Sequence, residues 1–557
     1  MKNQHVNNSV KTPLDNHNDF DFIIVGAGSA GCILANRLTE SGRYRVLLVE
    51  AGPADKNPWI HVPIGYAKTF FDPKCNWMYN TEPDLGINNR SSYWPRGKVL
   101  GGSSSINAMV FIRGQHADFD DWEIMGASGW GWADVLPYFK KLENIESGGD
   151  VNSDVLRGKN GPISVSRIGD SVHPTNRNFL AGCAELGFPR NPDFNGPSQE
   201  GVNHYQINTS NGLRVSASRA YLRPAAKRKN LQVVTNAHVT RLNFEGAGCV
   251  GITYFHKGSY HEVRAHREVV LSAGSVNTPQ ILQCSGIGDQ SLLGELGISV
   301  QHHAPLVGEN LQDHIGLSYF FRSRVPTLNN EFTSMTGCVR AGLRYLLTRK
   351  GPLSISVNHS GGFVRSSPAR ARPNIQLYFQ PTSYMNAPTG TRPMIALDKF
   401  AALSVGISQC RPTSRGHIKI GSADPLVAPK IVPNYLSTEY DVNEMIEGVK
   451  LIRKIAGTDA MKKIIVEEMV PGGKVLSDEA LIEDFRNRCG TIFHPVSTCA
   501  MGRNSDSAVV DPRLKVYGVN RLRIVDASIF PAVTSGNTNA PVMMVAEKAS
   551  DMILEDQ

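Results

Sequence analysis

Residues 19–52 (DFDFIIVGAGSAGCILANRLTESGRYRVLLVEAG) have the pattern of a complete nucleotide-binding βαβ unit. The apolar run at 22–25 predicts a buried strand, and residues 45–49 predict the second strand of the unit. Between them, residues 26–31 (GAGSAG) match the G-x-G-x-x-G turn, which brings a glycine backbone and the start of a helix against a pyrophosphate. This succession predicts an α/β, Rossmann-like domain that binds FAD or NAD.

The turn and the acidic residue that follows it in the sequence are expected to contact different parts of the nucleotide. Gly26 allows the tight turn, Gly28 lets backbone N–H groups approach a pyrophosphate, and Gly31 lets the helix pack against the sheet. Glu50 stands at the tip of the second strand, where its carboxylate can accept both ribose hydroxyls of the adenosine. Because a 2′-phosphate would be repelled there, the sequence argues against NADP.

The composition is that of an ordinary soluble globular protein. The 557 residues are 41% hydrophobic and 19% charged, and the length predicts two domains or one large composite domain. The formal charge of +8 is modest and the basic residues are scattered, so nucleic-acid binding is not supported. No apolar run approaches the roughly 18 residues of a membrane-spanning helix, so no span is expected.

Two features predict a cytoplasmic enzyme in a reducing compartment. Residues 1–18 are polar and rich in Asn, without the hydrophobic core of a signal peptide, so we expect a disordered leader. The nine cysteines are odd in number and include no C-x-x-C pair, which predicts reduced thiols and no zinc site. No metal is therefore expected.

Two further glycine-rich motifs follow the βαβ unit. Residues 97–107 (GKVLGGSSSIN) combine a double glycine with three hydroxyls and an amide, so the main chain of this loop can lie against a flat ring. Residues 274–282 (GSVNTPQIL) predict a loop that enters a short helix near Thr278 and Pro279.

With these motifs the chain resembles the glucose–methanol–choline (GMC) oxidoreductases, a flavoprotein family whose two signature patterns match 97–107 and 274–282. The resemblance extends over nearly the whole chain, and it is strongest to the branch of choline dehydrogenases and primary-alcohol dehydrogenases. Further similar stretches are 219–222 (RAYL), 307–314 (VGENLQDH), 414–416 (SRG), 433–436 (PNYL) and 523–528 (RIVDAS). The family implies FAD, a small-molecule alcohol as substrate, and an electron acceptor such as oxygen, a quinone or another carrier.

The resemblance also implies which residues meet FAD. They are Gly26, Gly28, Gly31, Glu50 and Ala51 at the ADP half, Val99, Asn107 and Val110 along the flavin with Gly102 from the same loop, Val239 at the adenine, Asp526 and Ala527 near the pyrophosphate and ribityl chain, and Asn537. Some members carry a His directly before the motif's Asn that attaches covalently to the flavin. In this chain that position is Ile106, whose aliphatic side chain has no nucleophile, so we expect FAD to be bound without a covalent link.

The chain is expected to divide into two domains built from several segments. Aliphatic runs at 231–234, 269–272 and 522–525 suit strands of the nucleotide-binding domain, whereas 374–379 and 417–420 alternate as in an antiparallel sheet. The predicted organisation is an FAD-binding domain at 19–315 with a substrate-domain insertion near 166–200, an α+β substrate domain at 316–487 built on an antiparallel sheet, and a C-terminal return to the FAD domain at 488–557 that carries the catalytic residues.

His494 and Asn537 are the predicted catalytic pair. His494 lies in 491–502 (TIFHPVSTCAMG), which matches the family's His-Pro motif, and an imidazole that titrates near neutrality can take the hydroxyl proton of an alcohol. The family places His or Asn at the position of Asn537, whose amide can donate a hydrogen bond to the developing alkoxide. Asn539 is the alternative for that second role.

The predicted reaction is hydride transfer from a neutral primary alcohol to FAD, giving an aldehyde. Choline-specific relatives tend to carry a Glu ahead of a Gly-Gly-Phe segment, whereas residues 358–363 (NHSGGF) contain no acidic residue. Aromatic side chains could still hold the choline cation, so a choline dehydrogenase stays an alternative. Two other activities occur on the same fold: a hydroxynitrile lyase, in which FAD is structural, and a photodecarboxylase, which lacks a base at the position of His494.

Overall fold

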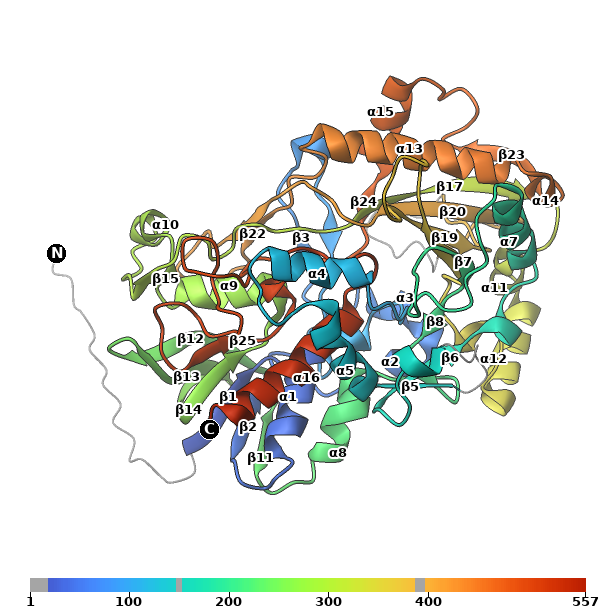
Figure 1. Ribbon diagram of the computed structural model, residues 1–557. Coiled ribbons are helices and arrows are strands. Elements are labelled where there is room, and N and C mark those ends of the chain that lie inside the picture. The colour runs from blue at the N-terminus through green and yellow to red at the C-terminus, as the bar shows by residue number, and fades with distance from the viewer. Residues whose placement is uncertain (1–18, 147–152, 386–395) are drawn as a thin grey trace, which may run out of the picture.

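The computed structural model describes residues 19–146, 153–385 and 396–557, and the predicted leader at 1–18 lies outside the described residues. Two β-sheets form the frame of the molecule, one at the lower left of Figure 1 and the other at the upper right. The chain ends in the first region, where the C-terminus lies beside β1 and β2.

The first sheet is Rossmann-like and is assembled from separated segments, as the sequence predicts. At its centre β1 (Asp19–Val25) lies between β2 (Val46–Val49) and β14 (Ser259–Leu271), and all three are parallel. On the outer side of β2 lies β11 (Leu231–Val234), and β25 (Leu522–Ile524) pairs with the end of β14. A hairpin of β12 (Ala237–Glu245) and β13 (Gly248–His256) extends the other half of β14, which is longer than the predicted strand.

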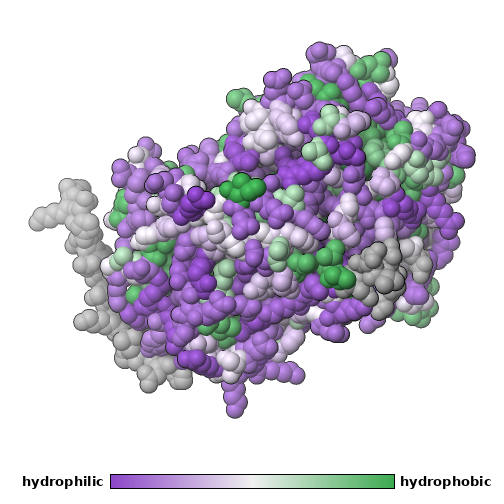
Figure 2. Space-filling model, in the orientation of Figure 1, coloured by the Kyte–Doolittle hydropathy of each residue, from purple (hydrophilic) through white to green (hydrophobic). Residues whose placement is uncertain are grey.

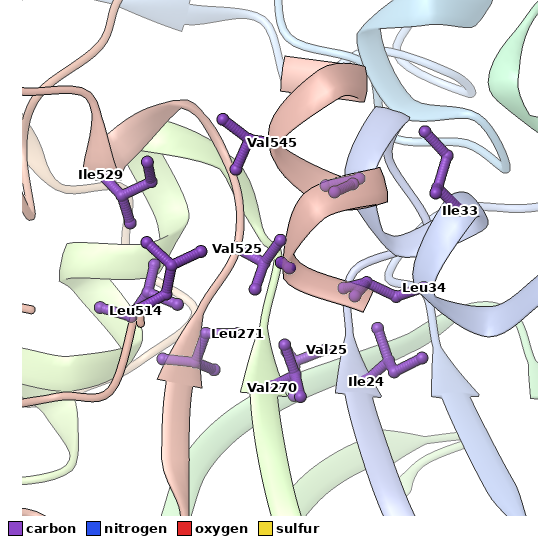
Figure 3. Packing of buried hydrophobic residues seen from close by; sticks show 14 of the residues in the cluster. Ile24, Val25, Ile33, Leu34, Val270, Leu271, Leu514, Val525, Ile529 and Val545 are labelled. Carbon is purple, nitrogen blue, oxygen red and sulfur yellow. The ribbon is translucent and has the colours of Figure 1, made fainter. Parts of the chain in front are cut away.

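The core of this domain lies between the sheet and two helices from opposite ends of the chain. Helix α1 (Ser29–Thr39) buries Ile33 and Leu34, and helix α16 (Asn539–Glu555) packs beside it and buries Val545. Figure 3 shows these side chains over Ile24 of β1 and Val270 of β14. Because the central strands of this sheet pair in parallel and are covered by these helices, β1, β2 and the end of β14 read as continuous aliphatic runs, the pattern on which the prediction depended.

The second sheet is antiparallel throughout its named strands. Its order is β18 (Ser360–Val364), β19 (Ile375–Gln380), β20 (Ala402–Gln409), β17 (Ile315–Ser323) and β23 (Ile465–Val470), and β24 (Gly490–Thr491) also pairs with β17. Helix α13 (Glu439–Ala456) lies across it (Figure 1) and buries Met445, Val449 and Ile452 against it. An α+β domain on an antiparallel sheet is therefore present.

Part of the predicted insertion near 166–200 packs with this second sheet. Helix α7 (Asn176–Glu185) places Phe179 in the same apolar cluster as Phe379 of β19, with the two rings stacked at 4.9 Å between centroids. The domain boundaries themselves stay a prediction.

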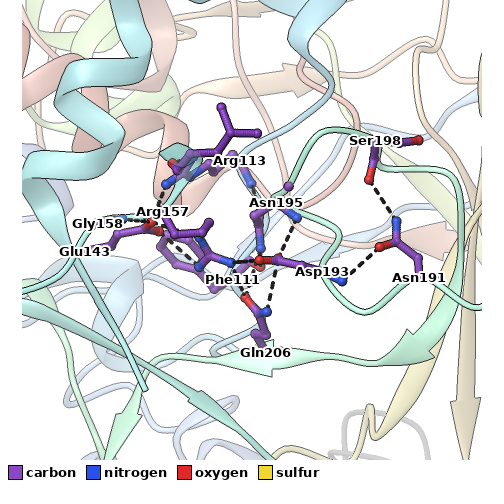
Figure 4. Close-up of polar contacts among 12 residues, drawn as sticks. Phe111, Arg113, Glu143, Arg157, Gly158, Asn191, Asp193, Asn195, Ser198 and Gln206 are labelled. Carbon is purple, nitrogen blue, oxygen red and sulfur yellow. Dashed lines mark hydrogen bonds and ion pairs between the residues drawn. The ribbon is translucent and has the colours of Figure 1, made fainter. Parts of the chain in front are cut away.

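A buried polar network fixes the chain that leads toward the insertion (Figure 4). The Glu143 carboxylate accepts from Arg113, from Arg157 Nε at 2.8 Å and from Gly158 N at 2.6 Å. Arg157 Nη1 in turn donates to both oxygens of Asp193, at 2.7 and 2.6 Å. The guanidinium of Arg157 therefore joins two buried carboxylates, which keeps each of them paired.

Two predicted elements differ from the structure. Helix α9 (Gly274–Cys284) begins at Gly274, earlier than the predicted start near Thr278, because the Asp526 carboxylate accepts from Gly274 N at 2.9 Å and from Thr278 Oγ1 at 2.6 Å. The run at 417–420 forms β21 (His417–Lys419), which pairs only with β22 (Lys430–Val432) and is not part of the large antiparallel sheet.

Candidate active site

A large cavity joins the carboxyl ends of β1 and β2 to the second sheet. Its volume of about 930 Å³ lies at the upper end of the range for ligand and cofactor sites. It is lined by residues of both sheets and of the C-terminal segment. Of the residues predicted from the sequence, the lining includes Gly26, Gly28, Glu50, Ala51, Gly102, Asn107, Val110, Val239, His494, Asp526, Ala527 and Asn537.

Two predicted cofactor residues do not line the cavity. A Cβ on Gly31 would lie 1.9 Å from the carbonyl oxygen of Gly26, so this glycine serves the close approach of α1 to the turn. Val99 is buried in a small apolar cluster with Ile60, Cys75 and Ile106. Any contact between these two residues and the cofactor stays a prediction.

The glycine turn leaves a space at the start of α1 that suits a pyrophosphate. Gly26 has a φ angle of +96°, and a Cβ there would lie 2.6 Å from the carbonyl oxygen of Ser272. The turn therefore requires glycine because of the protein's own backbone, whether or not a cofactor is bound. Gly28 differs, because among the described residues other than its chain neighbours the atom nearest to a Cβ there would be the carbonyl oxygen of Ser272, at 3.9 Å. The space beside Gly28 therefore belongs to the cavity, and no side chain of the described residues caps the first turn of α1. These free N–H groups fit the phosphates of FAD.

Glu50 occupies the end of β2 with its carboxylate held by the backbone. Oε2 accepts from Ala27 N and Oε1 from Gly52 N, both at 2.8 Å. Burial raises the pKa of this carboxyl to about 7, while the two backbone N–H groups and Lys98 act in the opposite direction. Each oxygen keeps a second lone pair, so the carboxylate can still accept from ribose hydroxyls.

The loop that carries the predicted flavin contacts is tied down by an arginine. Arg214 is buried and donates from Nη1 to Asn107 Oδ1 at 2.8 Å, and it donates from Nε to the carbonyl oxygen of Ile60 at 2.7 Å. Asn107 Oδ1 also accepts from Met109 N at 3.0 Å. Ile106 itself lines the cavity, at the position where covalent relatives carry His.

The hydrogen bonds of His494 define which of its ring nitrogens is the base. His314 Nε2 lies 2.8 Å from the carbonyl oxygen of Cys410, which can only accept, so Nε2 of neutral His314 carries the proton. His314 Nδ1 is then an acceptor, and at 3.0 Å it receives the Nδ1–H of His494. His494 Nε2 is consequently unprotonated, and its lone pair faces the cavity, where Asn537 Nδ2 lies 3.1 Å away and can donate to it.

Asn537, and not Asn539, lies against this lone pair. Asn537 Nδ2 is 3.1 Å from His494 Nε2, and Gln376 Nε2 donates to Asn537 Oδ1 at 3.3 Å, which turns the amide nitrogen toward the imidazole. Asn539 lies at the start of α16, where its Oδ1 accepts from Ser29 Oγ at 2.8 Å. Asn539 therefore belongs to the nucleotide end of the cavity.

The titration of His494 differs from the expectation of a base near neutrality. Burial, His314 and Arg96 lower the pKa of His494 well below 6.5, and burial lowers the pKa of His314 to about 4. Both imidazoles are therefore neutral at pH 7, as the tautomer argument requires.

Five residues around His494, including His314, were given no role by the sequence. Asp313 Oδ1 accepts from His494 N at 2.7 Å, and Asp313 Oδ2 accepts from Tyr435 at 2.5 Å and from Thr491 at 2.6 Å. Arg96 lines the cavity and donates from Nη2 to the carbonyl oxygen of Phe493 at 2.7 Å. Asp313 and His314 lie in 307–314, one of the stretches that carry the family resemblance, and this resemblance was the signal from which a role near the site could have been predicted.

Aromatic side chains line the cavity around Phe493, the residue that precedes His494. Phe70 packs edge-on against Phe493 and Tyr93, and Phe71 stacks on Tyr93 at 4.4 Å between ring centroids. Asn358 also lines the cavity, and its Oδ1 accepts from Gln380 Nε2 at 2.6 Å.

A Rossmann-like sheet and a cavity that extends from its glycine turn to a buried imidazole fit a dinucleotide-dependent oxidoreductase. The family model described as GMC oxidoreductase matches residues 20–316 with its N-terminal part and residues 412–546 with its C-terminal part. The chain belongs to the GMC oxidoreductase family, whose members bind FAD.

Similar proteins cover nearly the whole chain. Alcohol dehydrogenase (acceptor) of Pseudomonas putida is 44% identical over 545 residues, which are 96% of this chain and 96% of that protein. The mitochondrial choline dehydrogenase of Homo sapiens is 41% identical and covers 97% of this chain and 90% of its own. Among solved structures, pyridoxine 4-oxidase from Mesorbium loti has a TM-score of 0.85 at 30% identity and covers 95% of this chain and 98% of its own.

Proposed function

We propose that this protein oxidises a neutral primary alcohol to an aldehyde with FAD, which it holds without a covalent link. The observation that carries the proposal is the His314–His494 pair, which leaves the lone pair of His494 Nε2 in the cavity that also contains the glycine turn. A similar alcohol dehydrogenase of 44% identity supports the same substrate class.

In the proposed mechanism His494 Nε2 removes the hydroxyl proton of the substrate. Asn537 Nδ2, which contacts His494 Nε2 in the substrate-free protein, then donates to the substrate oxygen instead as negative charge develops there, and Arg96 contributes a nearby positive charge. His314 keeps the imidazole in the active tautomer and in its orientation. FAD, when bound, supplies the hydride acceptor. The aromatic and apolar lining excludes water from the reacting groups.

The charges of the cavity favour a neutral substrate over choline. Among the described residues of the lining, the acidic ones are Glu50 and Asp526, and both carboxylates accept backbone hydrogen bonds in the nucleotide-binding domain. Arg96, by contrast, lies close enough to His494 to lower its pKa. A trimethylammonium group would therefore meet a like charge beside the base and no carboxylate to pair with.

Four further points belong to the same proposal. Ile106 supports non-covalent FAD, because an aliphatic side chain cannot form the histidyl link. All nine cysteines are free in the structure, which supports a cytoplasmic compartment. The electron acceptor is oxygen, a quinone or another carrier. The domain division is 19–315, 316–487 and 488–557.

The direct test is anaerobic mixing of the holoenzyme with a panel of neutral primary alcohols and with choline, followed by the absorbance of the flavin. We expect alcohols to bleach the flavin and choline to do so much more slowly. Faster bleaching by choline would identify a choline dehydrogenase. Conversion of a cyanohydrin without bleaching would identify a lyase, and light-dependent loss of CO₂ from a fatty acid would identify a decarboxylase.

A further inference from the structure

Helix α12 (Met335–Thr348) presents an apolar face to solvent. Only a narrow stripe of this helix, at Gly337, Ala341 and Tyr345, is buried. The exposed side carries large apolar residues at helical spacing, so they share one face. They are Met335 (83% exposed), Val339, Leu343, Leu346 (68%) and Leu347 (82%).

Basic residues border this face on one side, and the helix itself has no acidic residue. Residues 335–350 contain four arginines and lysines and no Asp or Glu: Arg340, Arg344, Arg349 and Lys350. In the part of the chain that the structure describes, no ion pair involves any of the four. By helical geometry Arg340 and Arg344 lie between the apolar face and the buried stripe. The helix therefore has an apolar arc bordered by arginines that form no ion pair with the described residues.

The helix is firmly attached to the body of the protein. Tyr345 donates from its hydroxyl to the carbonyl oxygen of Gly212 at 2.9 Å. After α12 the chain passes through Pro352–Ser354 to Val357 and Asn358, which line the cavity. Figure 1 places α12 on the outside of the molecule at its right-hand end, and Figure 2 shows hydrophobic residues at the same edge.

We propose that the exposed face of α12 binds a membrane surface that contains anionic lipids, with the helix axis parallel to the bilayer. The apolar side chains would enter the region between headgroups and acyl chains while the arginines meet lipid phosphates, the arrangement of interfacial amphipathic helices. No described helix is long and apolar enough to cross a membrane, so the contact is peripheral. A second copy of the chain fits this face less well, because a symmetric pairing would bring two sets of unpaired arginines together.

Vesicle co-sedimentation of the holoenzyme tests the proposal. The probes are vesicles of phosphatidylcholine alone and vesicles with added phosphatidylglycerol. We expect stronger binding to the anionic vesicles, and weaker binding at high salt because salt screens the attraction.

Two variants separate the apolar from the charged contribution. Leu346→Gln with Leu347→Gln should lower vesicle affinity by at least tenfold, because both side chains would otherwise be withdrawn from water. Arg340→Gln with Arg344→Gln should lower it by about fivefold per arginine on anionic vesicles only. Leu85→Gln is the matched control, since Leu85 is 85% exposed on another element and should leave binding unchanged. All of these side chains are exposed, so flavin content and turnover of a water-soluble alcohol should match the unmodified protein.

Three outcomes would overturn the proposal. One is a wild-type enzyme that does not sediment with anionic vesicles. Another is a Leu346/Leu347 variant that binds them as well as the wild type does. The third is a wild-type dimer in sedimentation velocity that the same variant converts to monomers while neither form binds vesicles, which would assign the face to self-association.

Discussion

Replacing His314 tests the argument that a second imidazole selects the reactive tautomer of His494. His314→Leu removes the ring nitrogen that accepts from His494 Nδ1 at 3.0 Å, and it places an apolar side chain at this fully buried position. His494 Nδ1–H is then left without a partner. His494 can avoid this by moving its proton to Nε2, but in that tautomer it cannot accept the proton of an alcohol.

The expected loss follows from the cost of an unpaired buried donor. Such a group costs about 1–3 kcal/mol, and this is the free energy by which the active tautomer of His494 becomes less favourable. Since about 1.4 kcal/mol corresponds to a factor of ten, the rate of flavin reduction should fall by roughly 5- to 150-fold. FAD retention should be unchanged, because His314 is bonded to His494 and to Cys410 rather than to the glycine turn.

The measurement is anaerobic stopped-flow reduction of the enzyme-bound flavin by a saturating primary alcohol. His314→Asn is the matched control, because its amide oxygen can take the place of Nδ1 as an acceptor in a side chain of nearly the same size as leucine. We expect the Asn variant to recover most of the rate that the Leu variant loses. Flavin content and the thermal midpoint are measured for both, so that a folding defect is recognised.

Two results would refute the reasoning. If His314→Leu is reduced at the wild-type rate, His314 does not control the tautomer. If the Leu and Asn variants lose the same amount of rate at equal stability, the imidazole of His314 acts by its shape alone.

The remaining predictions concern the base, the cofactor and the buried ion network. His494→Ala should keep FAD but be reduced by alcohol about 10²- to 10⁴-fold more slowly, with partial recovery at high pH, and reduction at the wild-type rate would exclude His494 as the base. Because burial and neighbouring groups lower the pKa of His494 well below 6.5, its neutral form persists as the pH falls from about 8 to 6.5, so the wild-type reduction rate should be flat over that interval and decline only at lower pH. Gly28→Val should abolish FAD retention while the apoprotein stays folded by circular dichroism, because a Cβ at Gly28 would lie 3.9 Å from the carbonyl oxygen of Ser272 and so would not clash with it. Normal flavin content would contradict the placement of the phosphates. Acid precipitation should release free FAD because residue 106 is Ile, and yellow colour retained in the pellet would show a covalent link. Arg157→Met should leave Asp193 without its guanidinium and lower the free energy of unfolding by about 3–5 kcal/mol in urea titrations, and an unchanged transition would show that the network contributes little.

The local elements of the nucleotide site could be predicted from the sequence because their signals are short-range. The strand at 22–25 and the glycine turn are contiguous, and Glu50 follows directly on the second strand. Glycine at position 31 is required by a carbonyl oxygen only five residues earlier in the chain. Periodicity and turn chemistry are therefore sufficient there, and the resemblance to the family added His494 and Asn537.

Tertiary structure decided the remainder of the site. His314 and His494 are 180 positions apart, and the proton on one is set by a carbonyl of Cys410 on yet another strand end. Asp526 and Thr278 are separated by 248 positions, yet their hydrogen bond determines where α9 begins. The choice between Asn537 and Asn539 depended on their hydrogen-bond partners in the fold. Gln376 donates to Asn537, whereas Ser29 donates to Asn539. Hydrogen bonds of this kind depend on distances and directions between groups that the chain brings together only after folding, and no local pattern of residue types records them.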